Sequence, residues 1–203
     1  MYLEKLNKSL AKSLTSAGFD TPTPLQEKAI SKIKSGSDIL FIAPDNSGKS
    51  TTIAIGVIQQ LKCAMEDIPR AVIAVPTKEN ALALKEIFDK LAYNTDLRIL
   101  CAYSEKDLEE QRDEIYAGAD IVIGTAKRLG ELYSGTGLNF RILKMFIVDD
   151  MELVNKTEHF SQIERLSMIT SKYQVLFFTS KMTEKIEKLS NKAMKNMSII
   201  EIN

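Results

Sequence analysis

Short runs of apolar residues, rich in isoleucine and valine, alternate along the chain with stretches in which apolar residues recur every three or four positions. The first pattern is typical of strands buried on both faces of a sheet, and the second of amphipathic helices. Their alternation predicts an α/β fold with a mostly parallel central sheet of about seven strands and helices on both faces. The expected strands are Asp38–Ala43, Ala71–Val75, Leu97–Ala102, Asp120–Gly124, Met145–Asp149, Val175–Thr179 and Ser198–Ile202.

The helical pattern begins at the N-terminus. Apolar residues keep helical spacing from Leu3 to Leu14, which predicts one helix running up to Gly18. No stretch of the chain has the composition of an interdomain linker, so residues 1–203 are expected to form a single domain. The other expected helices are Pro24–Lys34, Lys49–Met65, Lys78–Ala92, Glu105–Ala117, Ala126–Leu132, Glu158–Ile169 and Thr183–Met194.

The composition narrows the classes of function. Lysine plus arginine and aspartate plus glutamate both number 27, so no net charge attracts nucleic acid, and any RNA contact has to come from a local patch. Cys63 and Cys101 show no metal-ligand spacing and are expected to be small buried hydrophobes in a reducing compartment. No apolar run approaches the roughly 18 residues of a membrane span, so we expect a soluble, cytoplasmic protein.

A polar turn between a strand and a helix carries the first candidate chemistry. The segment Ile39-Leu-Phe-Ile-Ala-Pro-Asp-Asn-Ser-Gly-Lys-Ser-Thr-Thr52 predicts a buried strand, a turn and a helix that begins near Gly48. A helix N-terminus presents unpaired amides to phosphate oxygens, Lys49 adds a positive charge, and the Ser50 hydroxyl is placed to bind magnesium. The alternative is an ordinary turn, because Gly-Lys-Ser after a strand also occurs by chance.

The same turn departs from a glycine-rich phosphate loop. Ala43 stands where the first glycine of such a loop is usual, and Pro44 donates no amide. Asn46 tolerates a positive φ, so the turn can still form. The carboxylate of Asp45 opposes a triphosphate by like charge, so we expect a reduced affinity for nucleotide.

The segment Gly18-Phe-Asp-Thr-Pro-Thr-Pro-Leu-Gln26 resembles the Q motif that precedes the phosphate loop in DEAD-box RNA helicases. A glutamine offers one donor and one acceptor, so it can pair with the N6 and N7 edge of adenine. The resemblance implies a RecA-like P-loop NTPase domain in which Gln26 recognises the adenine of ATP. Met1, with Tyr2 beside it, falls where the family has a ring that stacks on the base. The alternative is a helix-start turn with an exposed glutamine.

Two further segments resemble RNA-binding elements of that family. Pro76-Thr-Lys-Glu-Asn-Ala81 is similar to its Pro-Thr-Arg-Glu-Leu-Ala element, and Gly124-Thr-Ala-Lys-Arg-Leu129 is similar to its Thr-Pro-Gly-Arg-Leu element. Lys78 keeps the charge of the family arginine but loses its planar fork. Tyr103-Ser-Glu-Lys106 stands where the family has a glycine pair, and its side chains oppose a close approach of RNA. The alternative is that these helix starts are solvated caps.

Two acidic and polar strand ends complete the resemblance. Asp149-Asp-Met-Glu152 stands in the place of Asp-Glu-Ala-Asp, which implies that Asp149 holds magnesium and Asp150 orients the attacking water. Aspartate is shorter than glutamate by roughly 1.5 Å, and a misplacement on the order of 1 Å costs about a hundredfold in rate, so slow or absent hydrolysis is expected. Thr179-Ser-Lys181 resembles the Ser-Ala-Thr coupling motif, and we expect Lys181 to pair with Glu152. A plain strand-end turn is the alternative for the two aspartates.

The resemblance covers essentially the whole chain and implies ATP and Mg²⁺ as cofactors. His159, the single histidine, is followed by Phe160, so the family's His-Arg-x-Gly-Arg element and its second domain are expected to be absent. His159 itself is expected on a helix surface. The implied site consists of catalytic Lys49, Asp149 and Asp150; nucleotide-binding Phe19, Gln26, Ala43, Asn46, Ser47, Gly48, Lys49, Ser50 and Thr51; metal-binding Ser50 and Asp149; RNA-binding Pro76, Thr77, Lys78, Thr125 and Arg128; and coupling residues Glu152, Thr179, Ser180 and Lys181.

Three hypotheses about function are compatible with these motifs. The leading hypothesis is a DEAD-box-type domain that binds ATP and Mg²⁺, contacts RNA weakly through its backbone, hydrolyses slowly or not at all, and does not unwind RNA by itself. A partner helicase lobe or another protein would then complete it. The second hypothesis is an inactive pseudo-helicase that serves as an RNA- or protein-interaction module. A P-loop kinase for a small molecule is less favoured, because nothing resembles a cluster of lid arginines.

Overall fold

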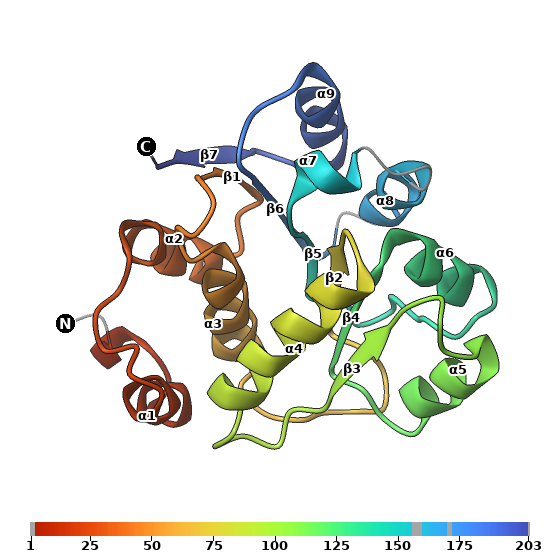
Figure 1. The fold of residues 1–203 in the computed structure, drawn as a ribbon, viewed down its shortest axis with the longest axis horizontal. Coiled ribbons are helices and arrows are strands. Elements are labelled where there is room, and N and C mark those ends of the chain that lie inside the picture. The colour runs from red at the N-terminus through yellow and green to blue at the C-terminus, as the bar shows by residue number, and fades with distance from the viewer. Residues whose placement is uncertain (1–2, 156–159, 170–171, 203) are drawn as a thin grey trace.

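A seven-stranded parallel sheet runs through the centre of the molecule (Figure 1). The computed structural model describes residues 3–155, 160–169 and 172–202. The strand order is β3-β4-β2-β5-β6-β1-β7, and every pair of neighbours is parallel, so the predicted fold class is confirmed. The strands are β1 (Ile39–Ile42), β2 (Ala71–Val75), β3 (Ile99–Ala102), β4 (Ile121–Thr125), β5 (Met145–Val148), β6 (Gln174–Thr179) and β7 (Ser198–Glu201).

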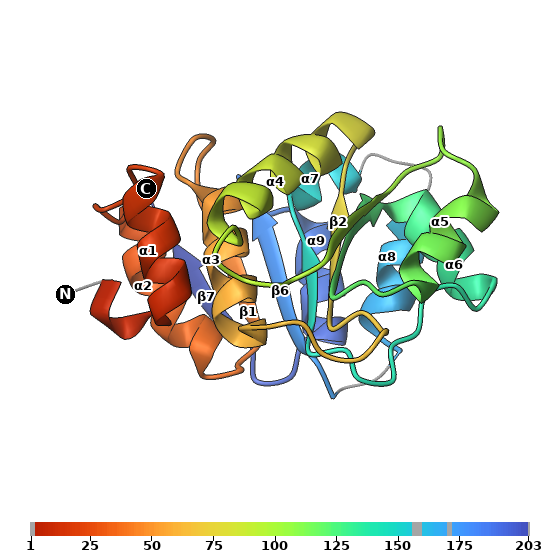
Figure 2. The same ribbon diagram turned by 90° about the horizontal axis from the view of Figure 1, so that it is seen from below.

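Helices cover both faces of this sheet. Helices α1 to α4 pack on one face, and α5 to α9 pack on the other (Figure 1). From a second side, α1 and α2 lie at one end of the molecule and α5 and α6 at the other (Figure 2). The helices are η1 (Leu3–Lys5), α1 (Lys8–Ser16), α2 (Pro24–Lys34), α3 (Lys49–Leu61), α4 (Lys78–Leu91), α5 (Leu108–Tyr116), α6 (Ala126–Ser134), α7 (Met151–Val154), α8 (Phe160–Ser167) and α9 (Glu184–Ala193).

Strands β1 to β6 contribute side chains to two separate cores. Phe41 packs with the α1–α4 layer, whereas its neighbour Leu40 packs with the α5–α9 layer. Ile73 and Val72 divide in the same way. Successive side chains of a strand point to opposite faces, so a strand buried on both faces has to be apolar at every position. This requirement explains the continuous isoleucine and valine runs.

The predicted first helix is interrupted, which corrects the sequence-based expectation. The Asn7 side chain accepts a hydrogen bond from the Leu10 amide at 2.8 Å and caps α1, while residues Leu3–Lys5 form a short 3₁₀ turn. Asp107 acts in the same way at the start of α5, which therefore begins at Leu108 rather than Glu105. Asn and Asp side chains compete for backbone amides and so stop a helix from extending backwards.

Several smaller expectations also change. Cys63 is exposed because α3 ends at Leu61, and Cys101 is partly buried, where desolvation raises the pKa of its thiol to about 11. The short helix α7 was not predicted. Met1, Tyr2 and His159 lie outside the described residues. Within the described part of the chain, no helix combines the length and apolar character that a membrane span requires.

Candidate functional site

The phosphate-loop candidate lies at the carboxyl edge of the sheet, between β1 and α3. Asn46 adopts φ 62° and Gly48 adopts φ 89°, so the turn uses the left-handed region at both positions. The Ala43 amide donates to the Thr179 carbonyl at 3.0 Å, which fixes the start of the loop against β6. Helix α3 has no side-chain cap, and Ser47 Oγ is buried without a hydrogen-bond partner among the described residues. The turn therefore holds polar groups that a ligand can satisfy.

Gln26 packs directly against this turn. A Cβ built on Gly48 would lie 3.2 Å from Gln26 Nε2 and 3.3 Å from Thr23 Oγ1, so a side chain at position 48 would crowd both groups. The Thr23 amide donates to Gln26 Oε1 at 3.0 Å, and the Gln26 amide donates to Thr23 Oγ1 at 3.3 Å. This capping box fixes the glutamine side chain. Gln26 is 5% exposed, so the alternative of a solvated glutamine is wrong.

The Lys49 ammonium group is buried and already paired. Lys49 Nζ lies 3.1 Å from Asp45 Oδ1 and 3.2 Å from Asp150 Oδ1, and it donates to the Ala43 carbonyl at 3.4 Å. Burial opposes the charge, but Asp150 and then Asp45 outweigh it and raise the pKa of Lys49 above its usual value. Lys49 is therefore positively charged and held between the turn and the end of β5.

Asp149 and Ser50 face each other at the same edge. Ser50 Oγ donates to Asp149 Oδ2 at 3.4 Å, and the Asp150 amide donates to Asp149 Oδ1 at 3.0 Å. Burial, followed by the neighbouring Asp150 carboxylate, raises the pKa of Asp149 to about 7. A carboxyl group with so few donors around it gains little from ionising unless a cation arrives.

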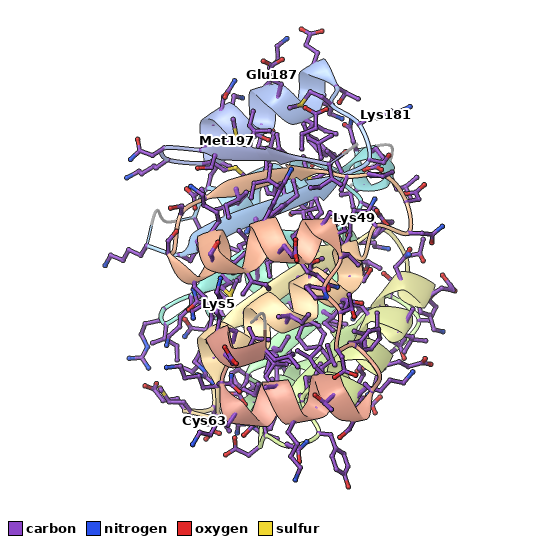
Figure 3. The ribbon with its side chains drawn as sticks, turned by 90° about the vertical axis from the view of Figure 1, so that its left-hand side faces the viewer. Lys5, Lys49, Cys63, Lys181, Glu187 and Met197 are labelled. Carbon is purple, nitrogen blue, oxygen red and sulfur yellow. The ribbon has the colours of Figure 1, made fainter. Side chains whose placement is uncertain are left out.

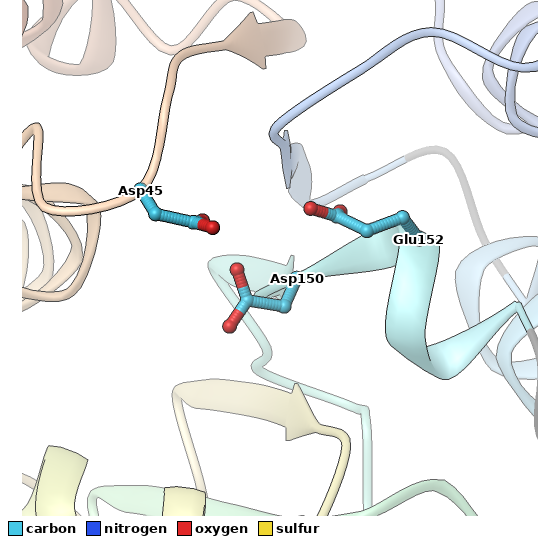
Figure 4. A group of neighbouring side chains, drawn as sticks. All are labelled: Asp45, Asp150 and Glu152. Carbon is cyan, nitrogen blue, oxygen red and sulfur yellow. The ribbon is translucent and has the colours of Figure 1, made fainter.

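Three carboxylates converge above this aspartate. One oxygen each of Asp45, Asp150 and Glu152 lies within 4.8 Å of the others, and the three side chains point toward one another (Figure 4). Asp150 holds φ 47°, a left-handed conformation that turns the chain sharply from β5 into α7. Asp45 was expected only as a charge opposed to phosphate, and its approach to the acidic motif was not predicted. Both segments follow strands of the parallel sheet, whose carboxyl ends lie at the same edge, and this was the available signal.

Glu152 is bound by the end of β6, but not by lysine. Thr179 Oγ1 donates to Glu152 Oε2 at 2.8 Å, and the Ser180 amide donates to Glu152 Oε1 at 2.9 Å. Burial is outweighed by the bonds from Ser180 and Thr179, which lower the pKa of Glu152. The expected pair of Lys181 and Glu152 is wrong: among the described residues they form no ion pair, the partners of Glu152 are Thr179 and Ser180, and Lys181 is exposed. Thr179 and Ser180 instead supply one donor to each oxygen of the carboxylate.

The predicted RNA-binding residues lie around β2, β3 and β4. Thr77 caps α4 and is exposed, and Lys78 Nζ lies 4.9 Å from the centre of the Tyr103 ring. Arg128 is instead 5% exposed and donates to the Ser104 and Lys106 carbonyls, both at 3.0 Å. It therefore braces a loop and does not extend into solvent.

The remaining predicted residues lie in different surroundings. Pro76 is half-buried, and Thr125 Oγ1 is buried with no hydrogen-bond partner in the described part of the chain. Thr51 is half-buried in the first turn of α3. Phe19 is 39% exposed and lines a hollow of about 830 Å³ between α1 and the end of α4, which no phosphate-loop residue lines. Lys49 and Lys181 lie toward one end of the molecule and Cys63 toward the other (Figure 3).

Comparisons of the sequence with known proteins all identify helicases as relatives. A sequence model of the DEAD/DEAH box helicase family matches residues 23–189. The chain is 28% identical over 198 residues to the DEAD-box ATP-dependent RNA helicase RhpA of Helicobacter pylori, covering 97% of this chain and 40% of that protein. It is 31% identical over 194 residues to the ATP-dependent rRNA helicase RRP3 of Scheffersomyces stipitis, covering 95% and 40%. The chain thus spans less than half the length of these relatives.

A solved structure agrees with the arrangement of the elements. The crystal structure of a DEAD box protein from the hyperthermophile Methanococcus jannaschii superposes with a TM-score of 0.91 at 26% sequence identity. The match covers 98% of this chain and 54% of that one. The sheet and its helices therefore have the RecA-like arrangement that the resemblance implied.

Proposed function

This chain belongs to the DEAD/DEAH box helicase family, and we propose that it binds ATP with Mg²⁺ at the carboxyl edge of its sheet. The observation that carries this proposal is the contact of Gln26 with Gly48, which joins a candidate adenine reader to a candidate phosphate loop. Asp149 stands across from that loop within reach of Ser50. One nucleotide can then touch all three elements.

The residues present fit the proposed ligands. The turn offers the unpartnered Ser47 hydroxyl and the uncapped amides at the start of α3, which are donors that suit phosphate oxygens. Ser50 and Asp149 offer the oxygen ligands that magnesium prefers. Gln26 Oε1 already accepts one bond from Thr23 but retains a second lone pair for adenine, while Nε2 can donate. Magnesium, when bound, would neutralise phosphate charge.

Nucleotide binding requires Lys49 to exchange partners. Its ammonium group now pairs with Asp45 and Asp150, so a phosphate has to replace at least one carboxylate. Asp45 is the partner that yields, because its side chain is 81% exposed and stands on a turn, whereas Asp150 is 23% exposed. This exchange lowers the affinity for ATP relative to a loop without an acidic residue.

Hydrolysis is proposed to be slow. Asp150 would have to orient the attacking water, but it is one methylene shorter than glutamate and is engaged with Lys49. The relatives are more than twice as long as this chain, and we propose that turnover and unwinding need a second lobe, from the same protein or from a partner. An arginine supplied by such a lobe is worth about 10³-fold or more in rate.

RNA is proposed as the second ligand, held weakly and mainly through its backbone. Pro76, Thr77 and Lys78 at the start of α4 supply an exposed hydroxyl and a positive charge. The net charge of zero means that binding depends on this local group and weakens with salt.

The competing function is a nucleotide-independent interaction module. The pairing of Lys49 with two carboxylates favours it, because this arrangement satisfies the lysine without any ligand. Thermal unfolding with and without millimolar Mg-ATP separates the two hypotheses. ATP at about a hundred times its Kd should stabilise the native state by about 2.7 kcal/mol. Lys49→Ala should abolish this shift, and an unchanged melting temperature of the wild type would favour the interaction module.

A further inference from the structure

A half-buried tyrosine stands at the end of β3, next to the proposed RNA-binding residues. Tyr103 directly follows Ala102, which pairs in register with Gly124, and Gly124 pairs in turn with Ala74 of β2. The ends of β2, β3 and β4 are therefore neighbours at the carboxyl edge. Lys78, at the first position of α4, places its ammonium group 4.9 Å from the centre of the Tyr103 ring.

The loop that carries Tyr103 is fixed from two sides. The buried Gln111 side chain pairs with the Tyr103 backbone in both directions: the Tyr103 amide donates to Oε1 at 3.2 Å, and Nε2 donates to the Tyr103 carbonyl at 2.8 Å. Arg128 binds the next carbonyls, of Ser104 and Lys106. These buried contacts hold the backbone at residues 103–106 in one conformation, so the ring is presented from a rigid support.

The Tyr103 side chain contributes little to the hydrogen bonding and aromatic packing of the described residues. Within the described residues its hydroxyl forms no hydrogen bond, and no other aromatic ring stacks on it. The ring is half-buried and does not belong to either hydrophobic core. The Lys78 ammonium group lies 4.9 Å from the ring centre, and the exposed part of the ring is the surface that a flat partner could reach.

We propose that Tyr103, with Lys78 against its ring, is a stacking platform for an unpaired base of single-stranded RNA. An aromatic ring beside a positive charge is the combination that holds a base and its adjoining phosphate, and stacking of this kind tolerates any base. Lys78 supplies the charge and Thr77 an exposed hydroxyl on the same side of the sheet edge. This inference rests on the proposed RNA binding and adds to it a contact with a base.

The opposite view is that Tyr103 obstructs RNA. A glycine at this position would let a nucleic-acid backbone approach the sheet edge more closely. The two views predict opposite results for Tyr103→Gly: the platform requires weaker binding, whereas an obstruction requires tighter binding. Tyr103→Phe keeps the ring and removes only the hydroxyl, so the platform predicts an affinity within about twofold of the wild type.

Fluorescence anisotropy with the intact chain tests the platform. The probes are a fluorescein-labelled oligouridylate and the same oligomer with abasic riboses. Removal of the bases should weaken wild-type binding by about 5- to 150-fold, and Tyr103→Ala should weaken oligouridylate binding by a similar factor. The variant should no longer distinguish the two oligomers. Tyr93→Ala is the matched control, because Tyr93 is 84% exposed beyond the other end of α4.

The outcomes separate the inference from the function on which it rests. Wild-type binding that exceeds Tyr103→Ala binding, with Tyr103→Phe and Tyr93→Ala unchanged and all variants equally stable to heat, supports the platform. RNA binding that Tyr103→Ala and Tyr103→Gly leave unchanged or tighten overturns the platform and keeps RNA binding. A wild type that binds neither oligomer overturns both.

Discussion

Two buried aspartates lie at opposite edges of the sheet, in contrasting surroundings. Asp120, at the amino end of β4, accepts hydrogen bonds from Arg70 at 2.5 Å, from Arg98 Nε at 2.9 Å, and from the amides of Met65 and Arg98, both at 3.1 Å. Burial is outweighed by the bonds from Arg98 and Arg70, which lower the pKa of Asp120. Asp149, at the carboxyl end of β5, receives a 3.4 Å bond from Ser50 and one amide, and its pKa rises to about 7.

The different numbers of donors around the two carboxylates indicate that Asp120 stabilises the fold and that Asp149 is suited to binding a ligand. A buried carboxylate surrounded by arginines gains nothing from a further ligand, whereas one that lacks donors is completed by a cation. The amino edge, which carries Asp120, therefore holds the fold together. The carboxyl edge instead carries the poorly bonded Asp149, next to the left-handed Asp150 and the paired Lys49, and a cation can supply the partner that Asp149 lacks.

The largest effect should come from breaking the amino edge. Asp120→Asn leaves Arg70, which is 1% exposed, without its counter-charge, and the free energy of unfolding should fall by about 3–5 kcal/mol. Asp67→Asn is the matched control, because Asp67 pairs with Arg98 but is 71% exposed, and its loss should cost no more than about 1 kcal/mol. Chemical denaturation measures both. Equal losses for the two variants would contradict the claim that the buried Asp120 pairs stabilise the fold more than an exposed pair does.

The next largest effect is the pH dependence of stability that Asp149 causes. Its native pKa of about 7 exceeds the unfolded value of about 3.9, so the native state holds the proton more tightly. This contribution is present below pH 4 and is lost as the pH rises toward 7. Without ligand, Asp149→Asn should then be more stable than the wild type at pH 8, by about 4 kcal/mol, and the gap should close at low pH. Thermal denaturation against pH measures it, and a constant gap would contradict the assignment.

Recognition of adenine should give a smaller effect. Gln26→Glu keeps the acceptor that caps α2 but replaces the amide donor with a second oxygen, so the helix start stays intact. The affinity for ATP should fall by about 1–3 kcal/mol, while that for GTP should change less. Calorimetric titration with both nucleotides provides the measurement. An equal loss for ATP and GTP would mean that Gln26 does not read the base.

The smallest expected effect is a gain. Asp45→Asn removes the exposed carboxylate that competes with phosphate for Lys49, and ATP should bind about tenfold more tightly, or about 1.4 kcal/mol. Asp113→Asn, an exposed acidic residue on α5, is the control with the same change of charge. Tighter binding in both variants would indicate a general effect of charge rather than relief of the Asp45 contact.

The sequence predicted the sheet well because its strands are buried on both faces. Runs such as Ala71–Val75 have to be apolar throughout, and this pattern survives without knowledge of tertiary contacts. Helix starts were less predictable, because the capping by Asn7 and Asp107 depends on how one side chain competes for an amide.

The candidate site was predictable as a set of segments but not as a set of partners. The order of strand, turn and helix predicted where Lys49 lies. Its pairing with Asp45 and Asp150 could not be predicted, because it depends on how the turn folds against the end of β5. Arg128 was expected to bind RNA, and its side chain lies buried where nearby loop carbonyls accept its hydrogen bonds. Glu152 likewise accepts a hydrogen bond from Thr179 Oγ1 and not from Lys181. Which of these neighbouring donors binds the carboxylate depends on local geometry, which the sequence does not specify.

The most direct test is a titration of ¹⁵N-labelled protein with Mg-ATP, followed by the amide resonances of the backbone. If one nucleotide fills one pocket, the amides of Gln26, Gly48 and Asp149 should shift together and yield a single dissociation constant. The Asp120 amide at the other edge should remain unchanged. Shifts confined to one of the three segments, or centred on a distant surface, would contradict the proposal that these segments form one nucleotide site.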